Sequence, residues 1–122
     1  MVKLESLKKS YQFKKILKEK KVHSEFFSIF AAKNFYKPKY KEDLIVSFVM
    51  KKKIGNAVKR NKIRRKLKAI VQKLLKKRGA ISKDYTYIVF GKSNAYLQKQ
   101  SLLMPLMEKC FKTIKLNDKI IN

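Results

Sequence analysis

The chain has 122 residues, 45% of them hydrophobic, and its 33 Lys and Arg against 8 Asp and Glu give a formal net charge of +25. This length fits a single domain, residues 1–122, and the low Gly and Pro content argues against disorder. One Cys and one His cannot build a disulfide framework or a usual zinc site, and no apolar run suits a membrane span or a signal peptide. We therefore expect a cytoplasmic protein that binds a polyanion, because so large a charge repels itself.

The first 50 residues predict one helix followed by two strands. Residues 7–18 have apolar side chains at helical spacing, and Ser6 is the expected N-cap. Residues 23–32 and 44–50 have the β-branched and aromatic composition of strands. The segment between them, residues 33–43, contains proline and many charges, so we expect a hairpin loop there.

The rest of the chain predicts a long helix, a strand and a last helix. Residues 56–77 carry an apolar stripe, and residues 85–90 (YTYIVF) are typical of a strand. The last helix is expected to start near Ser101, which would place Pro105 in the first turn, where proline is tolerated. The order α-β-β-α-β-α predicts an α+β fold, a small mixed sheet with the helices packed on one side.

The only cysteine and the only histidine are expected to be structural. Cys110 lies at helical spacing from Met107, Phe111 and Ile114, which predicts a buried thiol. His23 precedes a strand and is expected at its boundary.

Three of the four arginines, Arg60, Arg64 and Arg65, lie within six residues of the long helix. A guanidinium grips phosphate through a planar fork that lysine lacks, in a chain whose other charge is almost all lysine. On a helical projection, arginine and asparagine occupy one flank of this helix and lysine the other. The arginine flank comprises Arg60, Asn61, Arg64, Arg65 and Lys68, and the lysine flank Lys59, Lys62, Lys66 and Lys73. Asp and Glu are absent from residues 44–80, so this pattern favours nucleic-acid binding over an ordinary solvated face.

Aromatic residues on the first strand favour RNA as the ligand. Alternation places Phe26, Ser28 and Phe30 on one face, and Phe27, Ile29 and Ala31 on the other. Unpaired bases commonly stack on such a platform beside basic side chains. The alternative is that these phenylalanines belong to the core. No catalytic cluster accompanies them, since the acids are scattered and none can hold a pair of Mg²⁺ ions.

The segment KKKIGNAVKRNKIRRKLK, residues 51–68, resembles the signature of the bacterial ribonuclease P protein subunit. The matching elements are Lys52 to Val58, Arg60–Asn61 and Arg64–Arg65, and the resemblance extends over most of the chain. It implies a partner of a catalytic RNA that removes the 5′ leader of precursor tRNA. It also implies a left-handed crossover, against the usual hand.

The resemblance implies two sets of site residues and no catalytic residue in the chain. The arginine-rich helix would face the catalytic RNA, and a cleft between that helix and the sheet would take the leader. The predicted RNA-binding residues are Lys52, Lys53, Asn56, Lys59, Arg60, Asn61, Arg64, Arg65 and Lys68. The predicted leader-cleft residues are Phe13, Leu17 and Phe30 from the resemblance, together with Phe26 and Ser28 from the strand alternation.

The expected partners are therefore the catalytic RNA and precursor tRNA, with no membrane and no protein partner required. The chain alone is expected to bind no cofactor, and Mg²⁺ to act in the holoenzyme through the RNA. Two alternatives remain at this stage: a ribosomal RNA-binding structural protein or assembly factor, and a polybasic protein of the membrane surface. Only the spacing from Lys52 to Arg65 separates the first alternative from a ribonuclease P subunit.

Overall fold

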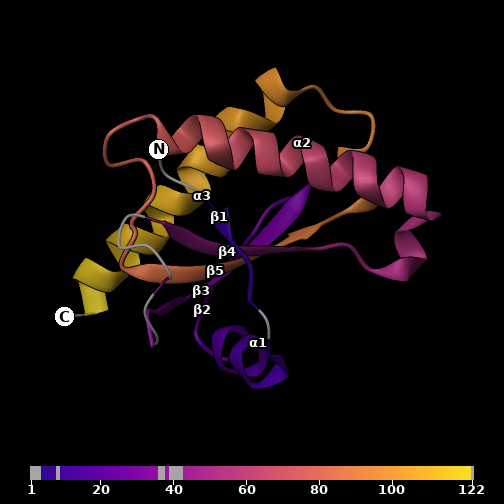
Figure 1. The fold of residues 1–122 in the computed structure, drawn as a ribbon. Coiled ribbons are helices and arrows are strands. Elements are labelled where there is room, and N and C mark those ends of the chain that lie inside the picture. The colour runs from indigo at the N-terminus through magenta and orange to yellow at the C-terminus, as the bar shows by residue number, and fades with distance from the viewer. Residues whose placement is uncertain (1–3, 8, 36–37, 39–42, 122) are drawn as a thin grey trace.

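The structure is a computed structural model that describes residues 4–7, 9–35, 38 and 43–121. The described part of the chain forms five strands, three α-helices and two short 3₁₀ helices (Figure 1). The strands are β1 (Leu4–Glu5), β2 (Lys20–His23), β3 (Phe27–Lys33), β4 (Leu44–Val49) and β5 (Tyr85–Gly91). The helices are α1 (Ser10–Leu17), η1 (Lys52–Ile54), α2 (Ala57–Leu75), η2 (Ser93–Ala95) and α3 (Gln100–Ile121).

The strands form one mixed sheet in the order β1-β4-β5-β3-β2. β5, the last strand in sequence, lies between β3 and β4. It is antiparallel to β3 and parallel to β4. The predicted hairpin between β3 and β4 is therefore wrong, because these two strands are not neighbours. Helix α2 connects the parallel neighbours β4 and β5, and the left hand expected for this crossover stays a prediction.

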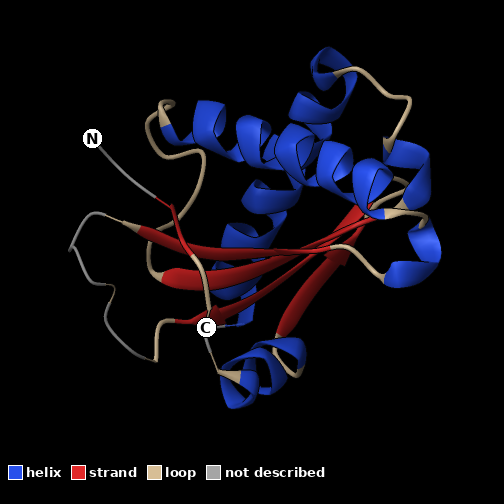
Figure 2. Ribbon diagram, turned by 45° about the vertical axis from the view of Figure 1, so that its right-hand side comes forward, coloured by secondary structure: helices blue, strands red, loops and turns tan. Residues whose placement is uncertain are grey.

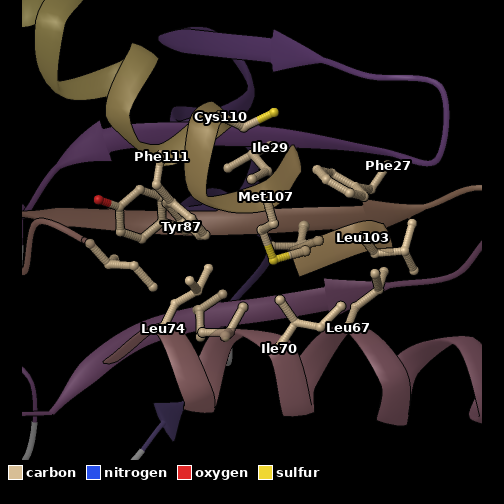
Figure 3. Close-up of a cluster of buried hydrophobic side chains, with 14 of the residues drawn as sticks. Phe27, Ile29, Leu67, Ile70, Leu74, Tyr87, Leu103, Met107, Cys110 and Phe111 are labelled. Carbon is tan, nitrogen blue, oxygen red and sulfur yellow. The ribbon is translucent and has the colours of Figure 1, made fainter. Parts of the chain in front are cut away.

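The helices cover both faces of the sheet. Helices α2 and α3 lie on one face and α1 on the other (Figures 1 and 2). Figure 3 shows the larger core, in which α2 and α3 pack on the sheet through Leu67, Ile70, Leu74, Leu103, Met107, Phe111, Phe27, Ile29 and Tyr87. A smaller core beneath α1 contains Leu7, Ile16, Ala32, Ile45 and Ile88. The α+β class is confirmed, but the expectation of helices on one side only is wrong.

A contact from a distant strand sets the start of α1. Leu7 is buried in the smaller core, and its backbone N–H donates to Ser47 Oγ at 2.8 Å. The chain just before it is extended and pairs with β4, so the helix begins at Ser10 with Lys9 as N-cap. The predicted Ser6 cap is wrong because tertiary pairing, forty residues away in sequence, holds this segment extended.

Two further boundaries differ from the sequence prediction. The single strand expected for residues 23–32 is instead the end of β2, a turn and most of β3. Ser24 makes this turn, donating its backbone N–H (2.9 Å) and its hydroxyl (2.8 Å) to the Phe27 carbonyl. Helix α3 starts at Gln100, so Pro105 lies beyond the first turn, inside the helix. Cys110 is buried as predicted, and burial raises the pKa of its thiol.

Candidate nucleic-acid interface

The start of α2 explains part of the signature segment in structural terms. Gly55 has φ of +153°, and a Cβ there would lie 2.9 Å from Lys59 Cδ. Asn56 is the N-cap, and its Oδ1 accepts the Lys59 backbone N–H at 2.9 Å. The Gly-Asn pair therefore turns the chain out of η1 and begins the helix. The side chain of Asn56, predicted to bind RNA, caps the helix here.

The arginine flank of α2 points to solvent. Arg60 Nε donates to the Asn56 carbonyl at 3.4 Å, and Arg64 Nη1 donates to Asn61 Oδ1. Arg65 and Lys68 are exposed. In the part of the chain that the structure describes, none of the three arginines pairs with a carboxylate. Since no acid neutralises them, these guanidinium groups are free to bind phosphate.

The lysine flank of α2 is instead held by the protein. Lys66 Nζ donates to the carbonyls of Ala95 (3.0 Å), Tyr96 (2.8 Å) and Gln98 (2.6 Å). Burial and, second, the charge of Lys62 lower the pKa of Lys66.

Lys59 belongs to the same flank. Its Nζ donates to Ser93 Oγ at 3.0 Å and lies 5.2 Å from the centre of the Tyr96 ring. Lys59, predicted to bind RNA, therefore also ties α2 to the connection between β5 and α3.

A cleft of about 800 Å³ lies on the α1 face, at the end of the sheet where β4 and β5 end. Its floor comes from β3 and β5, where Phe30 and Phe90 meet edge to face at 5.4 Å. Its lining is Leu17, His23, Ser28, Phe30, Lys51, Lys53, Ile54, Phe90, Gly91, Lys92 and Ser93. The structure thus brings together three of the predicted leader-cleft residues, Leu17, Ser28 and Phe30.

The other two predicted cleft residues lie elsewhere. Phe26 is 8% exposed and belongs to the larger core, because the turn at Ser24 breaks the strand alternation before β3 begins. Phe13 packs against the smaller core and does not line the cleft.

The predicted position of the cleft is also wrong. No residue of α2 lines it, since the larger core fills the space between α2 and the sheet.

Sequence reasoning missed several residues that line the cleft. Phe90 follows from strand alternation, because it shares a face with Ile88. Lys51, and Lys53, which was predicted to bind the catalytic RNA and not the leader, come from the segment after β4, and Lys51 Nζ lies 5.9 Å from the centre of the Phe90 ring. His23 could be found only from register, since it pairs with Ser28 across β2 and β3.

A flank of arginines without carboxylate partners among the described residues, and an aromatic cleft edged by lysines, define a nucleic-acid-binding protein of α+β fold. In the described part of the chain, no helix is long and apolar enough to cross a membrane. The same residues bring no three His, Cys, Asp or Glu side chains together around a possible metal ion.

Comparison with known proteins identifies the family. The family model described as Ribonuclease P matches residues 1–115. The ribonuclease P protein component of Mycoplasma capricolum subsp. capricolum is 31% identical over 109 residues, which cover 89% of this chain and 94% of that protein. That of Mycoplasma mycoides subsp. mycoides SC is 32% identical with the same coverage. The chain belongs to the ribonuclease P protein family and is a subunit of ribonuclease P, which processes the 5′ end of tRNA.

Solved structures agree with this assignment. The Staphylococcus aureus RNase P protein has a TM-score of 0.69 at 25% identity, with 90% of this chain and 94% of that chain covered. The Thermotoga maritima RNase P protein also has a TM-score of 0.69, at 23% identity and with 88% and 96% covered, and this likeness supports the fold. The family decides against the two alternatives, a ribosomal RNA-binding protein and a membrane-surface protein.

Proposed function

We propose that the arginine flank of α2 binds the catalytic RNA of ribonuclease P, while the cleft on the α1 face binds the 5′ leader of precursor tRNA. The observation that carries this proposal is the separation of the two surfaces on opposite faces of the sheet. One small domain can then contact two RNA molecules at once. Each surface has a chemistry suited to its own ligand.

The arginine flank suits a folded RNA with closely spaced phosphates. Arg60, Arg64 and Arg65 project from a rigid helix whose apolar side is fixed in the core. A guanidinium binds phosphate oxygens in pairs, so the flank can set the orientation of the protein on the RNA.

The cleft suits a single strand. Phe30 and Phe90 give it an aromatic floor, while Lys51, Lys53 and Lys92 bring positive charge to its edge. Proteins that bind single-stranded nucleic acid combine these two features, because bases stack on rings while lysines neutralise the backbone. The leader is the single-stranded part of precursor tRNA, so it is the expected occupant.

We place the catalytic centre, with its Mg²⁺ ions, in the RNA subunit, and propose that the protein raises substrate affinity. The composition supports this, because 8 acidic residues among 122 leave few oxygen ligands for a metal site. The protein would instead lower the repulsion between two polyanions.

Cleavage of precursor tRNA at low Mg²⁺ tests the proposal. The chain added to its catalytic RNA should restore cleavage that the RNA alone performs poorly, and the chain alone should cleave nothing. The same assay compares a variant of the arginine flank, Arg65→Ala, with a matched control, Lys109→Ala, which removes one exposed charge from α3. Cleavage by pure protein would contradict the placement of the catalytic centre. Equal activity with and without the chain would contradict its role as a subunit.

A further inference from the structure

A polar pair stands at one wall of the otherwise aromatic cleft. His23, at the end of β2, and Ser28, on β3, face each other in the antiparallel register. His23 Nδ1 and Ser28 Oγ form a hydrogen bond of 2.7 Å. The imidazole also meets the Phe30 ring edge to face, with ring centres 5.9 Å apart. Two contacts therefore fix the plane of this ring within the cleft lining.

The hydrogen bond to Ser28 leaves the other imidazole nitrogen for a ligand. Within the described residues, His23 Nε2 has no hydrogen-bond partner. A neutral imidazole has one donor and one acceptor nitrogen, so the direction of the Ser28 bond sets what Nε2 offers. When the Ser28 hydroxyl donates to Nδ1, Nε2–H is a donor, and when the hydroxyl accepts from Nδ1–H, Nε2 is an acceptor, so each tautomer matches a different base edge.

The rest of the cleft suggests which part of a nucleotide meets His23. Lys51 and Lys53 follow β4, whereas His23 is on β2, and β5 and β3 lie between these strands. Three strand spacings put the two walls about 14 Å apart. The wall formed by Lys51 and Lys53 matches phosphates, whereas the third lining lysine, Lys92, lies nearer His23 and its ammonium donates to the Ser24 carbonyl. The Phe30 side, beside His23, matches the face and edge of a base.

We propose that His23, oriented by Ser28, determines base specificity by hydrogen bonding the edge of one unpaired leader base that rests against Phe30. The inference depends on the proposed function, since it assumes that the leader occupies the cleft. It assigns sequence preference to a residue outside the signature segment. The floor supplies stacking that every base can make, and His23 supplies the contact that differs between bases.

The test measures binding of the holoenzyme to precursor tRNAs in which each leader position in turn carries A, G, C or U. Wild-type protein should prefer one base at a single position by roughly three- to tenfold, the effect of one net hydrogen bond. His23→Phe keeps a ring against Phe30 but removes both nitrogens, so it should abolish that preference. Ser28→Ala leaves the imidazole in place without its orienting bond and should weaken the preference. Lys21→Ala, an exposed neighbour on β2 outside the cleft lining, should leave it unchanged.

The outcomes separate this inference from the proposed function. If His23→Phe discriminates against mature tRNA as wild type does, and keeps the same base preference, the inference is wrong and leader binding stands. A wild-type holoenzyme that binds every leader sequence equally also overturns it. If wild type binds precursor and mature tRNA equally well, the cleft does not take the leader and both proposals fail. Unchanged circular dichroism of His23→Phe confirms that the variant folds, as expected for an exposed residue.

Discussion

Lys66 provides the sharpest test of the division between the two flanks of α2. Lys66→Met keeps the unbranched apolar stem and removes the ammonium, which donates to the carbonyls of Ala95, Tyr96 and Gln98. Ala95 ends η2, and Tyr96 and Gln98 lie between η2 and α3, so the variant loses a clamp between α2 and the chain that leads into α3. The Lys62→Met variant is the control, because among the described residues Lys62 Nζ makes a ring contact alone, 4.9 Å from the centre of Tyr96.

The size of the effect follows from these three bonds. A hydrogen bond to a charged donor contributes about 1.5–3 kcal/mol, but the site is only partly buried and water can replace the ammonium at the carbonyls. Removing a charge whose pKa is already lowered by burial also relieves a desolvation cost. We therefore expect Lys66→Met to lower the free energy of unfolding by about 1–3 kcal/mol, no more than one such bond contributes although three are lost, and Lys62→Met, which loses an exposed cation–π contact, by under about 1 kcal/mol.

Urea unfolding gives the free energies, and amide hydrogen exchange across residues 95–103 should show faster opening in Lys66→Met. Filter binding to the catalytic RNA should find the affinity of folded Lys66→Met close to wild type. The opposite result is a Lys66→Met variant that is as stable as wild type and loses as much RNA affinity as Arg65→Ala. That result would mean that α2 acts as a diffuse positive charge, without distinct flanks.

Three further predictions concern the arginine flank, the cleft and the core. Arg60→Ala, Arg64→Ala and Arg65→Ala should each weaken catalytic-RNA binding by about 1–3 kcal/mol. Lys73→Ala, whose ammonium is held by Gln100 at 3.0 Å, should cost clearly less, and equal losses at all four positions would contradict this. Phe30→Ala should weaken binding of precursor tRNA by about 1–3 kcal/mol and leave mature tRNA nearly unaffected, which a comparison of the two ligands checks. Phe30→Ala should lower the free energy of unfolding less than Phe27→Ala does. Phe27 is fully buried, so its variant serves as the control and should lose about 3–5 kcal/mol. Equal losses in the two variants would show that Phe30 is a core residue. Burial raises the pKa of the Cys110 thiol, so a thiol reagent at neutral pH should label the native protein far more slowly than the urea-unfolded protein. Similar labelling rates would show that Cys110 is accessible to solvent in the native protein.

Local sequence determined the elements whose signals lie within a few residues. The apolar stripe of residues 56–77 predicts α2, and Asn56 begins the helix through a bond to a backbone N–H three residues away. The two charged flanks follow from helical geometry alone, because 3.6 residues per turn fix which side chains share a side. The arginine cluster and the family signature could therefore be found without coordinates.

Only tertiary structure decided where these elements lie. β5 enters between β3 and β4, so a segment that looks like a hairpin loop joins strands that are not paired with each other. Leu7 is held by Ser47, which moves the start of α1 to Ser10 against the local capping signal. Such pairings depend on contacts between distant residues, whose energy no local pattern records.

The cleft shows the same limit. Strand alternation correctly put Ser28 and Phe30 on one face, but the turn at Ser24 interrupts the period and sends Phe26 into the larger core. His23 reaches the cleft only because β2 pairs with β3 in one register, and Lys51 and Lys53 reach it because β4 and β5 end at the same edge of the sheet. The residue types were present in the sequence. Their assembly into one cleft required strand order, register and the face chosen by α1, all of which are set by burial of the two cores.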